Sequence, residues 1–396
     1  MGGKVSTLEL TLNVEGKCGE NGNKKCNCDN SGKFVAEKKT DDPVKGFTKY
    51  AHSVTSGTFT LDGTLGGGGK IKVGGVIQSS IENVTEVAVY YWSHLDNKDE
   101  TTPLLLEVKY GGTTIYYVSS GSSNDWIYHG ILQGPALEQK LDDLNCQHNS
   151  AVTIDLSKGL SNSQTKYCCS GNHTDGTHNR ITVTSTQVRC NKQDHISTHL
   201  TYYKHETNLG NGVQLAAIKY NDSTGQRKRL KLGSLILPTK QSVKVAVYAF
   251  YCKDSVPKLI YVEGRDPNVT GWYKKPNSRD NNSGDEQWIE VLSVFLSITP
   301  KDLSSSIDHD EYNNLVTALN KFTGCTSYKQ CPTTPVPAES GKTERSTGGL
   351  LELPIATSLW STFGVSSGPL AGAGGLTGFG WWMFKRSKGD PWVRQI

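Results

Sequence analysis

The sequence predicts a mainly β protein: two tandem disulfide-containing β-sandwich-like modules, each closing with a short helix, and one C-terminal transmembrane helix. Three observations predict this class. A pattern of apolar strands occurs twice in the same order, ten cysteines divide between the two copies, and an uncharged stretch near the C-terminus is long enough to cross a bilayer. The content of 42 Gly and 17 Tyr, against two Met, favours short strands and turns over long helices.

The repeated pattern starts with VAVYYW at residues 87–92 and again with VAVYAF at residues 245–250. Both runs are almost continuously apolar or aromatic, which predicts strands covered on both faces. In each copy the next strand opens with a proline, Pro103 or Pro257, because proline cannot donate to a ladder. A tryptophan, a leucine-spaced helical stretch and a cysteine then follow: Trp126, residues 135–144 and Cys146, and later Trp288, residues 306–322 and Cys325.

The first module also contains a polar, cysteine-bearing segment at residues 15–48, which we expect to be a long stapled loop or a hairpin. Alternating residues at 58–61 and 70–73 predict two strands joined by the glycines at 66–69. A phosphate-binding loop would need Ser or Thr where Ile71 stands, so a hairpin connection is the favoured interpretation.

The second module starts with AVTIDL at residues 151–156, which echoes the predicted first strand at residues 7–14. The two copies are therefore joined with almost no linker. We predict module 1 at residues 1–149, module 2 at 150–326, a Pro/Thr/Ser-rich stalk at 327–349, a transmembrane anchor at 350–384 and a basic cytoplasmic tail at 385–396.

The cysteines predict two disulfide frameworks in an oxidising compartment, because they divide into four and then six. The candidates are Cys18, Cys26, Cys28 and Cys146, then Cys168, Cys169, Cys190, Cys252, Cys325 and Cys331. Spacing alone leaves their connectivity open. The alternative is a cytosolic protein with ten reduced thiols.

The C-terminal region predicts a single membrane span. Residues 353–384 carry no charge, and the run is longer than the ~20 residues needed to cross a bilayer. Trp381 and Trp382 suit the membrane interface, and Lys385 and Arg386 follow, so positive charge places the tail in the cytosol and both modules outside. Glycines in this run would also allow self-association in lipid.

The N-terminus favours the opposite location, with both modules in the cytosol. No secretory signal peptide is visible, and Gly2 with Ser6 fits the pattern for N-myristoylation. The alternative is therefore a cytosol-facing, tail-anchored and N-myristoylated scaffold. The paired cysteines and the basic tail favour modules outside the cell.

No catalytic, cofactor-binding or metal-binding residue is predicted, and the net charge of +4 gives no reason to expect nucleic acid. One cluster has the ligand types that zinc prefers: Cys168, Cys169, His173, His178, Cys190, His195 and His199. Its spacing matches no zinc-finger pattern, so disulfides and loop histidines are the better interpretation. Five Asn-x-Ser/Thr sequons, at Asn83, Asn172, Asn221, Asn268 and Asn281, are near the number expected by chance.

The main basic patch is QRKRLK at residues 226–231. On a strand Arg227, Arg229 and Lys231 would share one face, which together with Lys228 makes a candidate docking stripe for sulfated glycans, acidic lipid or an acidic partner. The favoured interpretation is a solvated hairpin edge, where charge discourages aggregation.

Three parts of the chain together resemble the expanded surface-protein families of piroplasm parasites, the Theileria equi type in particular. They are residues 87–92 with PLLL at 103–106, the junction from LDDLNC at 141–146 to Asp155, and the tail from LAGAGGL at 370–376 to KRSKGDPW at 385–392. The resemblance implies a multigene, parasite-encoded membrane protein that faces the host and has no established enzyme activity. It supplies no binding residues.

We therefore expect a membrane-anchored, non-enzymatic surface protein acting in host interaction, adhesion or antigenic display. Contact with an unknown host protein or glycan would be made by loops at residues 15–48, 157–180 and 274–287.

Overall fold

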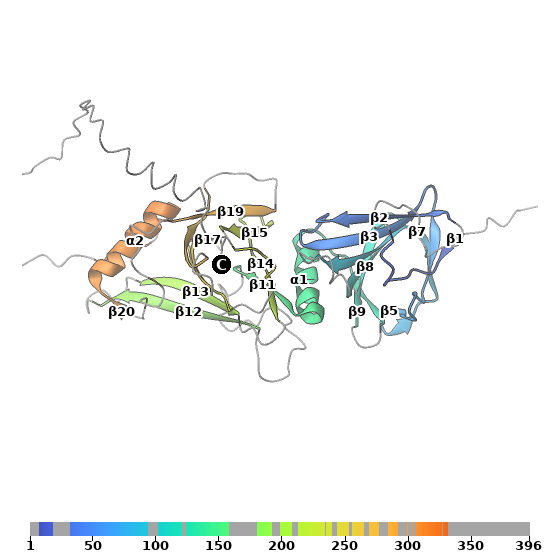
Figure 1. Cartoon of the computed structure of the whole chain (residues 1–396), viewed down its shortest axis with the longest axis horizontal. Helices are drawn as coiled ribbons and strands as arrows, with labels where there is room; N and C mark the ends of the chain where they lie inside the picture. The colour runs from blue at the N-terminus through green and yellow to red at the C-terminus, as the bar shows by residue number, and fades with distance from the viewer. Residues whose placement is uncertain are drawn as a thin grey trace, which may run out of the picture. The chain divides into compact units, whose positions relative to one another are not determined.

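The computed structural model describes residues 8–18, 32–93, 102–120, 124–157, 180–191, 199–207, 213–233, 235–239, 244–252, 256–264, 269–276, 284–291, 299, 303, 306–326 and 328–331 (Figure 1). Residues 1–334 form one compact unit. The predicted mainly β class is confirmed, because the described residues form two ten-stranded sheets with a helix after each.

The first sheet contains the strands from Leu8 to Gly130. They are β1 (Leu8–Leu10), β2 (Phe34–Thr40), β3 (Phe47–Val54), β4 (Phe59–Asp62), β5 (Ile71–Val73), β6 (Val76–Ile77), β7 (Ser80–Trp92), β8 (Pro103–Tyr110), β9 (Thr113–Ser119) and β10 (Trp126–Gly130). Helix α1 (Pro135–Asn149) follows.

The second sheet begins directly after α1. Its strands are β11 (Ala151–Asp155), β12 (Ile181–Cys190), β13 (His199–Thr207), β14 (Gln214–Asn221), β15 (Arg227–Leu232), β16 (Ala246–Tyr251), β17 (Pro257–Glu263), β18 (Gly271–Lys274), β19 (Asp285–Glu290) and β20 (Ser306–Ile307). Helix α2 (His309–Thr323) follows.

The two sheets repeat the same path. In the first, β1 pairs in parallel with β4, β2 and β3 form a hairpin, β3-β7-β8-β9-β10 run antiparallel, and β10 pairs in parallel with β5. In the second, β11 with β14, the hairpin β12-β13, the series β13-β16-β17-β18-β19 and the parallel pair β19-β15 match these pairings one by one. The repeat seen in the sequence is therefore a repeat in topology.

The first sheet closes on itself. Strand β4 pairs with β7 at one end of the series β7-β8-β9-β10-β5. At the other end, the Thr64–Lys70 bridge pairs the chain after β4 with the chain before β5. Strands of one sheet thus line every side of the core. The glycines at 66–69 lie in this hairpin turn, as predicted, and Gly67 and Gly68 both have a positive φ that side chains rarely adopt.

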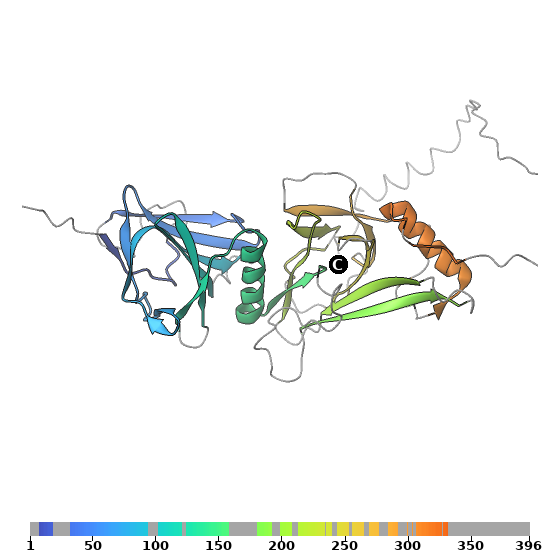
Figure 2. The ribbon, with the colours of Figure 1, turned by 180° about the vertical axis from the view of Figure 1, so that it is seen from behind.

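Strand β7 is covered on both faces, which confirms the prediction from its continuous apolar run. Val87, Val89 and Tyr91 face the core enclosed by the sheet. Tyr90 and Trp92 face the other way, where Leu137, Leu141 and Leu144 of α1 pack against them. Strand β16 is arranged likewise between its own core and α2, and Figures 1 and 2 show α2 alongside the second sheet.

The helices follow from local sequence. Proline lies in the first turn of α1, and Leu137, Leu141 and Leu144 recur with helical spacing on one buried side. Asp308 caps α2 by accepting a hydrogen bond of 2.9 Å from the backbone N–H of Asp310, and Gly324 ends it in the left-handed conformation. The cap explains why α2 starts at His309, three residues after the predicted start.

The structural match between the copies differs by two residues from the sequence match. Aligning VAVYYW with VAVYAF pairs Tyr91 with Ala249, whereas in space Tyr91 corresponds to Tyr251. Each of these tyrosines lies opposite the proline that opens the next strand. Each also donates its hydroxyl to a buried carbonyl, of Val14 or Leu156. A shift of two residues keeps every side chain on the same face, so the alternation pattern conceals it.

The segment at residues 15–48 differs from a simple loop. Its second half contains β2 and the start of β3, which pair antiparallel from Phe34 opposite Val54 to Thr40 opposite Thr48. Phe34, Ala36 and Phe47 are buried in the sheet. The hairpin alternative is thus confirmed there, and residues 34–40 and 47–48 are excluded from the contact loop that we expected.

Two disulfides fasten the C-terminal end of the second module to its sheet. Cys252, directly after β16, bonds Cys325, directly after α2, and Cys190 at the end of β12 bonds Cys331. Cys146 is disulfide-bonded as well. Cys26, Cys28, Cys168 and Cys169 lie outside the described residues, while Cys18 is half-buried.

The predicted stalk from residue 332 on, the anchor at 350–384 and the tail at 385–396 lie outside the described residues. Within the described part of the chain, no helix has both the length and the apolar character that a membrane span requires.

Val89→Asp should abolish folding of the first module. Val89 is 2% exposed at the centre of β7, so the variant would bury an unpaired carboxylate and lose more than about 4 kcal/mol of unfolding free energy. Urea unfolding followed by near-ultraviolet circular dichroism measures the loss. Ile77→Asp on β6, where the side chain is 48% exposed, is the control and should change stability by less than about 1 kcal/mol. Equal stability of both variants would contradict the assigned faces.

Candidate functional site

A cluster of buried charges joins α1 to the second sheet. Glu138 and Asp142 lie one turn apart on α1, away from its leucine side. Lys219 of β14 contacts both: its Nζ lies 2.7 Å from Glu138 Oε1 and 2.9 Å from Asp142 Oδ1. Arg227 of β15 donates from Nη2 to Asp142 Oδ2 at 3.0 Å and from Nη1 to Asp155 Oδ2 of β11 at 2.9 Å.

The cluster, which we call the α1 clamp (Glu138, Asp142, Asp155, Lys219 and Arg227), is almost fully removed from water. The side chains of Lys219 and Arg227 are 2% and 3% exposed, and that of Asp142 is 8% exposed. Burial alone would raise the pKa of Asp142, but Lys219 and Arg227 hold it below its ordinary value. Burial would likewise lower the pKa of Arg227, and Asp142 and Asp155 raise it instead. Asp142 and Arg227 are therefore both charged at neutral pH.

A second polar contact lies beside the clamp. Asp285 of β19 receives Lys45, from the turn of the β2-β3 hairpin, at 3.0 Å and Lys231 of β15 at 2.9 Å. Burial raises the pKa of Asp285, but the two ammonium groups lower it by more, so this pKa lies below its ordinary value. The hairpin turn and α1 are thus both tied to the second sheet by ion pairs.

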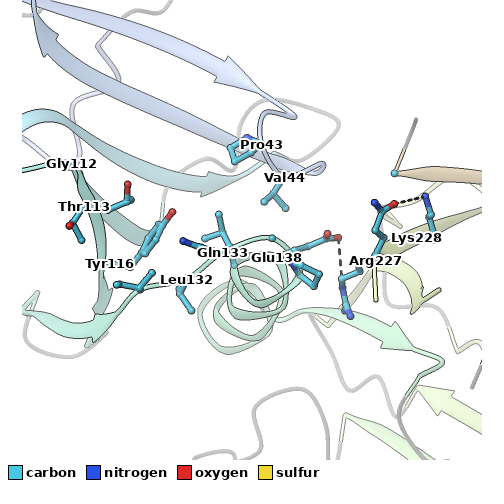
Figure 3. A pocket seen from close by; sticks show the side chains of 17 residues that line it. Pro43, Val44, Gly112, Thr113, Tyr116, Leu132, Gln133, Glu138, Arg227 and Lys228 are labelled. Carbon is cyan, nitrogen blue, oxygen red and sulfur yellow. Dashed lines mark hydrogen bonds and ion pairs between the residues drawn. The ribbon is translucent and has the colours of Figure 1, made fainter. Parts of the chain in front are cut away.

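A cleft of about 870 Å³ opens next to the clamp. Its walls come from the β8-β9 turn, the β2-β3 turn, the segment leading into α1, and the β14-β15 turn. Figure 3 shows Gln133 and Glu138 between Thr113 and Tyr116 on one side and Arg227 and Lys228 on the other. This volume lies within the ~300–1,000 Å³ that is usual for ligand sites.

Two buried cations in the cleft wall keep hydrogen-bonding capacity. Among the described residues no acceptor lies within hydrogen-bond distance of Arg227 Nε, and the nearest carboxylate oxygen, on Glu138, is 3.7 Å away. The Lys228 ammonium is 3.4 Å from Gln226 Oε1 and 3.9 Å from Asp222, both long contacts for a residue that is 7% exposed. Arg227 and Lys228 both line the cleft, but the Arg227 Nε atom itself is closed off from solvent, so Lys228 is the donor that a ligand could reach.

Tyr116 in the cleft wall is held by the buried carboxylate of Glu107. Glu107 of β8 accepts hydrogen bonds from Tyr90 at 2.7 Å, from Tyr116 at 3.0 Å and from Lys49 at 2.6 Å. Burial and the adjacent Glu107 carboxylate raise the pKa of both tyrosines above the ordinary value. Tyr116 is therefore a neutral donor committed to Glu107 and unsuited to proton transfer near neutral pH.

The structure separates the four residues of the predicted basic stripe. Arg227 and Lys228 are buried, Arg229 is half-buried and donates to the carbonyl of Leu237 at 3.2 Å, and the side chain of Lys231 is 58% exposed. Strand β15 lies between β14 and β19, so it is no sheet edge. The expected stripe of exposed cations differs from this arrangement because three carboxylates reach Arg227 from α1 and β11.

The zinc-like residues do not form a site within the described part of the chain. Cys190 is held in its disulfide with Cys331, and no group of His, Cys, Asp or Glu side chains among the described residues is arranged to bind a metal ion. Cys168, Cys169, His173, His178 and His195 lie outside the described residues, as does the side chain of His199.

Sequence reasoning missed Glu138, Asp142 and Lys219. The available signals were two acidic residues four apart on the polar side of a predicted helix, and a lysine inside the apolar run LAAIKY at 215–220. Neither signal identifies the partner, because the pairing joins residues 77 positions apart.

Comparison with known proteins adds no relative: no protein-family model, no curated protein and no solved structure matches this chain.

Asp142→Asn should destabilise the fold strongly, because it leaves Lys219 and Arg227 buried with less compensating charge. We expect a loss of about 3–5 kcal/mol in unfolding free energy, measured by urea titration at pH 7. The matched control is Glu37→Gln, which breaks the exposed Lys39–Glu37 pair of 3.2 Å and should cost less than about 0.5 kcal/mol. A similar small effect of both substitutions would show that the clamp contributes nothing measurable.

Stability should fall as pH drops from about 6.5 to about 4. Burial lowers the pKa of His205 on β13 to about 4, partly opposed by Asp155, so between these values the unfolded chain binds a proton that the folded chain does not. The contribution of His205 to the unfolding free energy therefore decreases by about 3 kcal/mol over this window and changes no further below it. Urea midpoints at several pH values measure the slope. An equal slope in His205→Asn would refute the assignment.

Proposed function

We propose that this chain is a membrane-anchored, non-enzymatic surface protein that acts in host interaction, adhesion or antigenic display. The disulfides carry the proposal. Cys190–Cys331 and Cys252–Cys325 fasten the last described residues of the second module to its sheet, and such bonds persist outside the cytosol. Stabilisation of about 2–4 kcal/mol for each would suit a protein that meets proteases and has no chaperones nearby.

The proposed stalk begins immediately beyond this fastening and leads to the proposed anchor. Residues 332–349 continue as the Pro/Thr/Ser-rich stalk, residues 350–384 as the single span and residues 385–396 as the cytoplasmic tail. Any force on the stalk would reach β12 through Cys331 and would bypass α2. The resemblance to piroplasm surface families agrees with this placement and suggests that the exposed polar loops vary.

The contact surface of the proposal is smaller than the three sequence loops. From the first loop it keeps residues 15–33 and the turn at 41–46, since the rest pairs in β2 and β3. It also keeps 157–180 and most of 274–287, and the cleft beside α1 is added to it.

The second candidate is the cytosol-facing scaffold, acylated at Gly2 and tail-anchored. Free thiols at Cys190, Cys252, Cys325 and Cys331 would favour it.

Labelling of intact cells tests on which side of the membrane the modules and the tail lie. A membrane-impermeant amine-reactive biotin, followed by mass spectrometry without reduction, should label exposed module lysines such as Lys231 and leave Lys385 and Lys388 unlabelled. The same digest should contain the peptides joined by Cys190–Cys331 and Cys252–Cys325. Permeabilised cells are the control, in which the tail lysines become labelled too. Labelling of the tail but not the modules in intact cells, or free thiols at these positions, would refute the proposal.

A further inference from the structure

The cleft beside α1 combines features of a binding site that the loops do not share. Its volume of about 870 Å³ would hold several residues of another chain, and its rim is polar on both sides. Gln133, before α1, and Gln226, before β15, are both exposed and both line it. The first turn of α1 also lines the cleft, and its N-cap residue, Gly134, provides no side chain to cap the backbone N–H groups.

The Lys228 ammonium in the cleft wall is incompletely satisfied. Its contacts, 3.4 Å to Gln226 Oε1 and 3.9 Å to Asp222, are both long for a residue that is 7% exposed. A buried donor with only long contacts costs free energy, so an acceptor oxygen on a ligand would be favoured at this place.

The charges decide what kind of acceptor fits. Arg227, Lys228 and Lys219 contribute three positive charges, and Glu138, Asp142, Asp155 and Asp222 contribute four negative ones. A carboxylate or sulfate would meet Glu138 in the cleft wall without a net positive field to offset the repulsion. Neutral carbonyl oxygens satisfy the same donor without that cost.

The apolar part of the wall favours a peptide over a sugar as the ligand. Val44, Ile131 and Leu132 line the cleft together with Pro43 and Pro135, and Ile131 is 60% exposed. Among the described residues of the wall the one aromatic side chain is that of Tyr116, which is 4% exposed and whose hydroxyl is committed to Glu107, so it offers no open ring face for a sugar to stack on. Aliphatic surface beside amide groups suits a peptide, whose side chains and backbone alternate.

We infer that this cleft binds an extended peptide segment of a partner protein through its neutral backbone. Gln133 and Gln226 each pair with a backbone amide of the segment, the Lys228 ammonium donates to one of its carbonyl oxygens, and Ile131 contacts an apolar side chain. The inference deepens the proposed function, on which it rests for its biological setting, and names the partner chemistry of that site.

A library of random unstructured dodecapeptides displayed on phage tests the inference with the purified, oxidised full-length chain in detergent. Peptides with alternating apolar residues should be enriched and, once synthesised, should bind measurably by fluorescence anisotropy. The double variant Gln133→Ala/Gln226→Ala should bind them about 30-fold more weakly, roughly fivefold for each lost hydrogen bond. Ile131→Asp should weaken binding by a similar factor, and both changes lie at exposed positions, so the fold should persist.

Gln187→Ala is the matched control, because Gln187 is an exposed glutamine of β12 outside the cleft and its loss should leave binding unchanged. Absence of enrichment, or equal affinity in the double variant and the unchanged chain, would overturn the inference. So would cleft-dependent binding of neutral oligosaccharides on a glycan array with no peptide binding. All these readouts use purified protein, so they are separate from the cell labelling that tests the surface location.

Discussion

The α1 clamp is the interaction on which the arrangement of the two modules depends. Helix α1 closes the first module with its leucine side and offers Glu138 and Asp142 to β14 and β15 of the second. One 15-residue helix is therefore part of the core of one module and the docking element of the next. Because β11 starts two residues after α1 ends, no linker separates the modules, and the clamp fixes the direction in which the second sheet is built. The cleft exists because this docking leaves the β8-β9 and β14-β15 turns facing each other across the start of α1.

Helix α2 differs from α1 on the side that corresponds to the clamp. Matching Leu137, Leu141 and Leu144 with Tyr312, Val316 and Leu319 puts Asn313 at the place of Glu138. Asn313 exchanges two hydrogen bonds with the backbone of Cys331, at 2.7 and 3.1 Å, and Asn320 donates to the carbonyl of Tyr328 at 3.4 Å. The segment at residues 328–331 thus covers the side of α2 that corresponds to the clamp side of α1, and Cys190–Cys331 keeps it there.

The sequence allows the strands and helices to be predicted because each is encoded locally. Continuous apolar runs gave β7 and β16, prolines marked the first residues of β8 and β17, and leucine spacing gave both helices. The exact equivalence of the copies could not be predicted, since a two-residue shift leaves the alternation of faces intact. The strand register, which places Tyr91 and Tyr251 opposite the prolines, and the hydrogen bonds of the two tyrosine hydroxyls reveal it. The clamp could not be predicted from the sequence for another reason. A lysine and an arginine in strands are normally solvated, so their burial depends on carboxylates that are distant in sequence.

A buried ionic contact is a poor choice if stability alone is required, because apolar residues of equal volume often serve as well or better. Its geometry, however, restricts the modules in a way that an apolar contact does not. Arg227 uses Nη1 for Asp155 of β11 and Nη2 for Asp142 of α1, while Lys219 spans Glu138 and Asp142 on successive turns. If α1 moved by one turn along its axis, one carboxylate would lose its cation and one cation would remain buried without a carboxylate. The free energy of unfolding would then fall by several kcal/mol. The clamp therefore specifies one register between the modules, and a fixed register is the condition for a cleft whose walls come from both.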